Sequence, residues 1–170
     1  MISYASHDDI PFLVDLLNSA YRGERSQKGW TSEAHLIAGE VRTDENNIKD
    51  VMGKDGSVFL KYVDEDQKIS GCVNLQQHPR GIYLGMFSVD PDQQGAGIGK
   101  KLLMAAESHA KTVGSPAIYM YVISVRDELI NWYKKYGYRE TGERVAFPED
   151  GLTGQHLQEL EFMILEKPMN

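Results

Sequence analysis

The feature that most constrains this chain is a glycine-rich turn between a predicted strand and a predicted helix. Residues 88–101 read SVDPDQQGAGIGKK, with glycines at 95, 97 and 99. Glycine lets the backbone turn sharply and approach a ligand closely. The first turn of a helix offers unpaired N–H groups and the positive end of the helix dipole. The segment therefore predicts an anion site, most naturally one for phosphate.

The spacing of these glycines excludes two common phosphate-binding loops. A P-loop places glycine five positions before the Gly-Lys pair and Ser or Thr after it, whereas this chain has Gln94 and Lys101 there. A dinucleotide-binding turn reads G-x-G-x-x-G inside a βαβ unit. Here G-x-G-x-G follows a predicted antiparallel meander over 58–89. Both nucleotide interpretations therefore fail.

Hydrophobic periodicity predicts the elements around this turn. Thr31 is expected to cap a short second helix with Glu33 in its first turn, after a loop over 21–30. Another helical turn or two is predicted over 47–52. The other helices are predicted at 10–21, 97–113 and 128–136, and the strands at 1–5, 58–63, 68–76, 81–89, 117–123, 138–147 and 156–166.

Two segments of the chain resemble the GCN5-related N-acetyltransferase (GNAT) superfamily. The pattern Gln94-x-x-Gly97-x-Gly99 resembles that family's acetyl-CoA-binding motif. Residues 125–138 are similar to its next motif, in which a helix ends in Tyr-x-x-x-Gly and an aromatic residue; here these are Tyr133, Gly137 and Tyr138. The resemblance implies an α/β (α+β) fold. Its mixed, mostly antiparallel sheet of about seven strands is flanked by about four helices, in the order β-α-α-β-β-β-α-β-α-β-β.

The resemblance also implies how acetyl-CoA, the co-substrate, is held without a metal. The main chain of Phe87 and Val89 is placed along the pantetheine arm, between two splayed strands. Arg126 stands where many members carry asparagine seven residues before the catalytic tyrosine, and Arg126 and Asn131 are candidate polar contacts. The pyrophosphate contacts implied are Gln94, Gly95, Ala96, Gly97, Ile98, Gly99 and Lys100.

The chemistry implied is direct attack of a neutral amine on the thioester. The family's catalytic tyrosine maps onto Tyr133, whose neutral phenol is suited to protonate the leaving thiolate as a general acid. The Val89 N–H is a candidate donor to the oxyanion. No general base is identified, and Glu24 and Glu33 are candidates because they flank the loop that shapes the acceptor site in this family.

The acceptor site is expected at the loop after the first helix. Tyr21, Arg22, Glu24 and Trp30 lie in or beside that loop and are the candidate substrate-binding residues. We predict an N-acetyltransferase that acts on a small-molecule amine. Two alternatives stay open: a protein or peptide N-acetyltransferase, and a non-catalytic sensor that binds coenzyme A.

Composition limits the partners and the location. We expect one domain over 1–170, and a net charge of −7 disfavours nucleic acid, because phosphate binding needs a basic face. No apolar run approaches the roughly 18 residues of a membrane helix. The first nine residues lack the features of a secretory signal, so a cytoplasmic location is expected. The last two predicted strands offer an edge for a homodimer.

Overall fold

A computed structural model describes all 170 residues, and its main element is a sheet of seven strands. The order across the sheet is β1-β3-β4-β5-β6-β9-β7, and all neighbours are antiparallel except the parallel pair β5 and β6. The predicted fold, mixed and mostly antiparallel, is confirmed. The strands are β1 (Ile2–Tyr4), β3 (Ser57–Val63), β4 (Ile69–His78), β5 (Gly81–Val89), β6 (Ala117–Ile123), β7 (Arg139–Ala146) and β9 (Glu161–Pro168).

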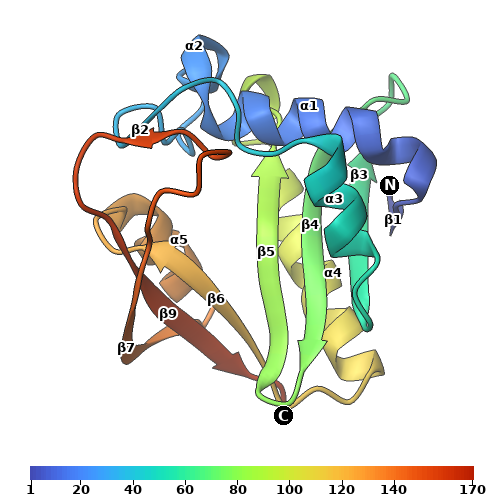
Figure 1. Cartoon of the computed structure of the whole chain (residues 1–170). Helices are drawn as coiled ribbons and strands as arrows, with labels where there is room; N and C mark the ends of the chain where they lie inside the picture. Colours follow the sequence, from blue (N-terminus) through green and yellow to red (C-terminus); the bar gives the residue numbers. More distant parts are fainter.

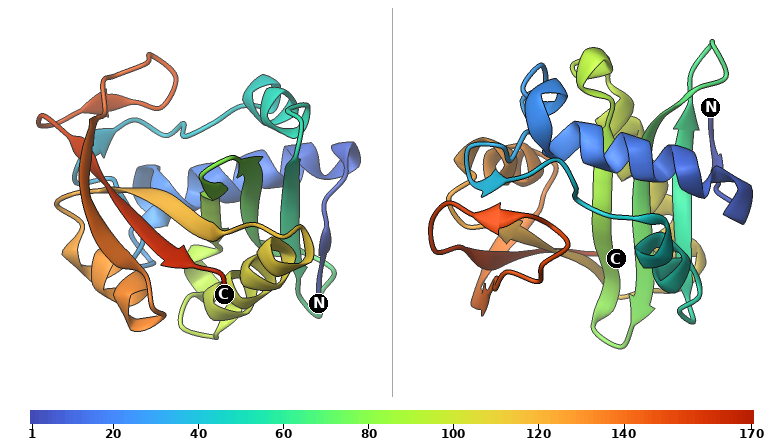
Figure 2. Two further views of the ribbon diagram at one scale, coloured as in Figure 1. Left: turned by 90° about the horizontal axis from the view of Figure 1, so that it is seen from below. Right: turned by 45° about the horizontal axis from the view of Figure 1, so that its top comes forward.

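Helices cover both faces of this sheet (Figures 1 and 2). On one face, α1 (Ile10–Tyr21) and α3 (Glu45–Met52) enclose a small apolar cluster with β3 and β4. On the other face, α4 (Ile98–Thr112) and α5 (Asp127–Lys135) cover the larger cluster. Two single turns of 3-10 helix lead into α1 and α4, at His7–Asp9 and Pro91–Gln93. None of the helices is long and apolar enough to cross a membrane.

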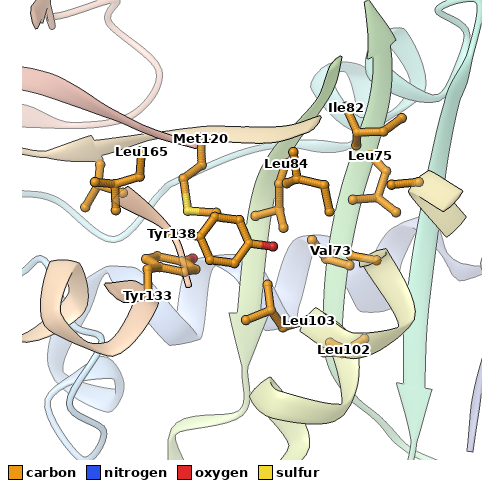
Figure 3. Packing of buried hydrophobic residues seen from close by; sticks show 14 of the residues in the cluster. Val73, Leu75, Ile82, Leu84, Leu102, Leu103, Met120, Tyr133, Tyr138 and Leu165 are labelled. Atoms are coloured by element: carbon orange, nitrogen blue, oxygen red, sulfur yellow. The ribbon is translucent and has the colours of Figure 1, made fainter. Parts of the chain in front are cut away.

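The larger cluster fixes α4 against the centre of the sheet. Leu102 and Leu103 are fully buried against residues of β3, β4 and β5. Figure 3 shows Tyr133 and Tyr138 on the same side of this cluster as Met120. The start of α4, which carries the glycine-rich turn, is therefore held by the core rather than by the loop itself.

The predicted helix after Thr31 does not form, and that prediction was wrong. Residues 31–36 form turns and irregular chain, and the loop predicted over 21–30 instead contains the four-residue helix α2 (Gly23–Ser26). Thr31 and Glu33 do not serve a helix end because their side chains bond elsewhere: Thr31 to Gln94, and Glu33 to two arginines. The helix predicted over 47–52 begins earlier, at Glu45, because the Asp44 side chain caps it by accepting from the Asn47 N–H.

The last predicted strand also differs from the structure. Gln155 and His156 form β8 (Gln155–His156), which pairs with β2 (Ile37–Ala38) in a separate two-stranded sheet. The main-sheet strand β9 starts only at Glu161, and its partner β7 lies at the edge of the sheet. Residues 157–160 join no strand, and the Leu157 N–H donates to the Leu36 carbonyl beside β2 rather than to the main sheet.

Strands β5 and β6 separate soon after they start. They pair only at Ile82–Ile118 and Tyr83–Tyr119, although β5 continues to Val89 and β6 to Ile123. Figure 1 shows β5 upright beside β4, with β6 and β9 running obliquely away from it. The splayed strands implied by the family resemblance are thus observed, and they open a gap in the middle of the sheet.

The packing of α4 on β4 generates the first prediction. A Cβ at Gly71 of β4 would lie 2.8 Å from the side chains of both Ile98 and Leu102. We expect Gly71→Ala to lower the free energy of unfolding by about 1–3 kcal/mol, the usual cost of overpacking, measured by urea unfolding. Gly53→Ala, at an ordinary φ of −77° and with its nearest contact at 3.4 Å, is the control. Equal stability of the two variants would contradict this packing.

Candidate active site

The glycine-rich turn forms the N-terminal end of α4. Gly95 and Gly97 have φ of 92° and 83°, a region that residues with a Cβ rarely adopt. The main-chain N–H groups of residues 95–100 donate no hydrogen bond within the protein. A Cβ at Gly95 or Gly97 would meet no atom within 4 Å. The turn therefore offers a run of free donors beside open space, as an anion site at a helix N-terminus requires.

A cavity of about 280 Å³ runs from this turn to α5. Three residues that the sequence patterns did not single out line it together with Tyr133: Leu129 and Trp132 of α5, and Tyr136 just after that helix. Their spacing along the helix was the available signal, because residues three and four apart share a helix face. Of the residues predicted to contact the cofactor, Phe87, Val89, Gln94, Gly95, Gly97, Ile98, Gly99 and Lys100 line this cavity.

Three other predicted cofactor contacts lie outside this lining. Ala96 belongs to the turn but does not border the cavity. Asn131 is exposed on α5 and borders neither this cavity nor the second one described below. Arg126, just before α5, is buried and turned toward the other side of Tyr133.

The side chain of Gln94 braces the turn against the loop after α2. Its Oε1 accepts a hydrogen bond from the Trp30 N–H at 2.8 Å. Its Nε2 donates to Thr31 Oγ1 at 2.6 Å and to the Val89 carbonyl at 3.1 Å. A Cβ at Gly29 would collide with this amide, so a larger residue there would displace the Gln94 side chain. Trp30 and Thr31 are thereby held at the wall of the cavity.

Tyr133 lies where the first cavity meets a second one of about 160 Å³. Its ring packs edge-on to Phe87 with centroids 6.3 Å apart, and to Trp132 at 5.2 Å. Burial raises the pKa of Tyr133 well above its ordinary value. The phenol therefore keeps its proton at neutral pH, as a proton donor must.

The second cavity occupies the gap between β5 and β6. It continues past Tyr133 from the first cavity, because Tyr21, Phe87, Leu129 and Tyr133 line both. The aromatic residues Tyr83, Tyr121, Phe147 and Phe162 form one wall, and the charged residues Glu33, Arg42 and Arg126 also border it.

A β-bulge in β5 directs Phe87 into this junction. The pairing of β4 with β5 shifts register between Cys72 and Asn74, so β5 has one residue more than β4 at this point. Met86 lies in this bulge and has a positive φ of 48°. A bulge of this kind re-aims the following side chain. The hydroxyl of Tyr21 donates to the Phe87 carbonyl and holds the bulged strand, and burial raises the pKa of Tyr21 to about 12.

The strand end after this bulge presents an N–H group to the gap. The Asp90 N–H donates to Ser70 on β4 at 2.8 Å. Successive N–H groups of a strand point to opposite neighbours, so the Val89 N–H points away from β4 and toward β6. The oxyanion role of this N–H group stays a prediction.

A buried ion-pair triad lies beside the second cavity. Glu33 bonds Arg22 at 2.6 Å and Arg126 at 3.3 Å, and the side chains of the two arginines are 0% and 6% exposed. Arg126 also donates to the Thr31 carbonyl at 2.8 Å, and Arg22 to the Thr153 carbonyl at 2.7 Å. The triad therefore joins the end of α1, the loop at 31–33, the β6–α5 turn and the loop before β8.

The predicted substrate-binding residues separate into different places. Tyr21 lines both cavities, and Trp30 lines the first one. Arg22 is buried in the triad behind the second cavity. Glu24 is exposed on α2 and borders neither cavity, whereas Glu33 borders the second one. No group of three or more His, Cys, Asp or Glu side chains is placed to hold a metal ion.

Comparisons with known proteins give relatives in sequence and neighbours in structure. The mycothiol acetyltransferase of Actinosynnema mirum is 31% identical over 104 residues, which cover 61% of this chain and 34% of that protein. An acetyltransferase of the GNAT family from Staphylococcus aureus Mu50 has a TM-score of 0.71, with 19% identity over 100% of this chain and 99% of that one. The ribosomal-protein-S18-alanine N-acetyltransferase of Escherichia coli has a TM-score of 0.72, with 16% identity over 100% and 94%.

These matches are to proteins of the acyltransferase class. More particularly, the chain belongs to the Acetyltransferase (GNAT) family, which matches residues 11–138. The predicted family is thereby confirmed. The solved structures, at under 20% identity, support the fold alone. The match spans only about one third of the mycothiol acetyltransferase, so that protein's activity is not transferred to this chain.

The triad generates the second prediction. Glu33→Gln removes the one carboxylate between two buried guanidinium groups, and we expect a loss of about 3–5 kcal/mol in the free energy of unfolding. Glu24→Gln removes an exposed carboxylate without an ion-pair partner and is expected to change it by less than about 0.5 kcal/mol. Urea unfolding of both variants is the measurement, and equal stabilities would contradict the role of the triad.

Proposed function

We propose that this protein is an N-acetyltransferase that moves the acetyl group of acetyl-CoA to the amine of a small molecule. The observation that carries the proposal is the line from the free amides of residues 95–100, through one cavity, to Tyr133 at the mouth of a second cavity. A diphosphate, a thioester and an amine would lie along this line in that order.

The chain's own groups fit the co-substrate. The free N–H groups of 95–100 would hold the pyrophosphate, and Lys100 at the cavity wall adds a positive charge. The apolar surfaces of Phe87, Leu129 and Trp132 suit the pantetheine arm. Acetyl-CoA supplies an activated acyl group, so the protein has to position the reactants and move one proton.

The proposed reaction is a direct acyl transfer. The lone pair of the neutral amine forms a bond to the thioester carbonyl carbon, and the carbonyl oxygen takes the negative charge. The Val89 N–H donates a hydrogen bond to that oxygen. The C–S bond then breaks, and the Tyr133 hydroxyl gives its proton to the departing thiolate. The amine's proton leaves to solvent, and the tyrosine recovers a proton from there.

The second cavity favours a small acceptor over a protein. At about 160 Å³ it is small for a ligand pocket, and aromatic side chains line one of its walls. A peptide acetyltransferase would instead use an open groove for several residues. The third possibility, a sensor that binds coenzyme A without transfer, leaves the proton donor at Tyr133 without a role.

Binding at the turn provides the third prediction. Gly97→Ala places a Cβ at a φ of 83°, which costs roughly 1–2 kcal/mol and turns the free amides from their present directions. We expect coenzyme A to bind about 10-fold or more weakly, measured by titration calorimetry. The matched control is Gly114→Ala, because Gly114 has a φ of 70° at the other end of α4 with equally open surroundings. Unchanged affinity of the Gly97 variant would refute the proposed cradle.

Proton donation provides the fourth prediction. Tyr133→Phe keeps the packed ring and removes the hydroxyl, so we expect kcat to fall about 10²-fold, the usual size of acid–base assistance. The rate is to be measured in single turnovers, in which acetyl transfer is observed directly. Tyr138→Phe is the control, since that buried hydroxyl has no partner and borders neither cavity. If the two variants transfer acetyl equally fast, Tyr133 is not the donor.

A further inference from the structure

We propose that the acceptor amine also carries a carboxylate, and that the guanidinium of Arg42 binds it in the second cavity. This inference rests on the proposed function and names the class of acceptor. It assigns a substrate contact to a residue that the sequence patterns did not single out.

Arg42 is a cation at the cavity wall without a partner. Its side chain forms no hydrogen bond and no ion pair within the protein, and it borders the second cavity. Its backbone is nevertheless fixed, because Asn18 of α1 accepts hydrogen bonds from the N–H groups of Arg42 and Thr43. The Asn18 amide also donates to the Thr43 carbonyl at 3.2 Å. The guanidinium is thus presented from an anchored segment.

The charged groups around Arg42 leave the cavity positive. Glu33 is the one acidic residue in its lining, and both of its oxygens are already bonded to arginines. The lining holds two arginines and one glutamate, a net charge of +1, and Arg22 behind Glu33 adds another positive charge. The whole chain carries −7, so this cavity is opposite in sign to the protein around it.

Neighbouring titratable groups agree with this placement. Burial raises the pKa of Tyr83, and the positive charge of Arg42 opposes that rise. The positive charge of Arg42 also acts on Asp150, but the two side chains form no ion pair. The Asp150 Oδ1 instead accepts hydrogen bonds from the N–H groups of Leu152 and Thr153. Asp150 therefore does not neutralise Arg42 by direct contact.

The opposite wall specifies what else the acceptor carries. The rings of Tyr83 and Tyr121 are 5.2 Å apart, Tyr121 and Phe162 are 5.9 Å apart, and Phe162 and Phe147 are stacked at 4.3 Å. Such a wall suits a flat or apolar group. A guanidinium matches a carboxylate through two parallel N–H···O bonds. The acceptor class is therefore an amine with a carboxylate and an apolar or aromatic group.

The test compares two acceptors of nearly the same shape: phenylalanine and phenylalaninamide. Acetyl transfer from acetyl-CoA is followed for the wild type and for Arg42→Gln, and the ratio of kcat/KM for the acid over the amide is formed for each protein. We expect this ratio to fall about 10- to 100-fold in the variant, the size of one charge-assisted hydrogen bond. Comparing ratios between proteins cancels the different basicities of the amines.

The control variant is Arg139→Gln. Arg139 is exposed at the start of β7, forms no ion pair and borders neither cavity, so it changes the net charge equally. The ratio is expected to stay at the wild-type value. A ratio that Arg42→Gln leaves unchanged, or that Arg139→Gln lowers as much, overturns the carboxylate site.

A second readout separates this inference from the proposed function. Calorimetry measures the binding of N-acetylphenylalanine and its amide to the protein saturated with coenzyme A. Tighter binding of the acid that is lost in Arg42→Gln supports the site even if no panel amine is acetylated, in which case only the proposed function fails. Equal binding of acid and amide, or binding of neither, overturns the carboxylate site.

Discussion

The early separation of β5 from β6 is the constraint on which the rest of the site depends. The two strands pair in parallel at only two residue pairs, and beyond Tyr83 they no longer pair with each other. Backbone groups that would otherwise close the sheet are left for a ligand or for side chains such as Tyr21, which bonds the Phe87 carbonyl. Both cavities and the position of Tyr133 between them follow from this gap.

The gap is kept open by polar contacts between distant segments. The Gln94 amide joins the glycine-rich turn to Trp30 and Thr31, and the Arg22–Glu33–Arg126 triad joins four segments behind the second cavity. These bonds explain structurally why Arg126 can stand where many family members have asparagine. It borders the second cavity and completes the triad, whereas the first cavity is lined without it.

Local patterns predicted the elements better than the contacts between them. The periodicity of 97–113 and the glycines at 95, 97 and 99 were sufficient for α4 and its turn, because both depend on neighbouring residues. The Thr31 helix was mispredicted because a capping pattern does not reveal that Gln94 and two arginines bind those side chains. The sequence patterns did not single out Arg42, because its place at a cavity depends on strands 40 to 120 residues away in the sequence.

The central claim is that the free amides of residues 95–100 are the binding groups for a diphosphate. Amide hydrogen exchange with and without coenzyme A tests it most directly, because unbonded amides at a helix start exchange fast. The account predicts fast exchange over residues 95–100 in the free protein and slow exchange in the complex. Coenzyme A binding that leaves these amides fast, and protects another part of the chain instead, would contradict it.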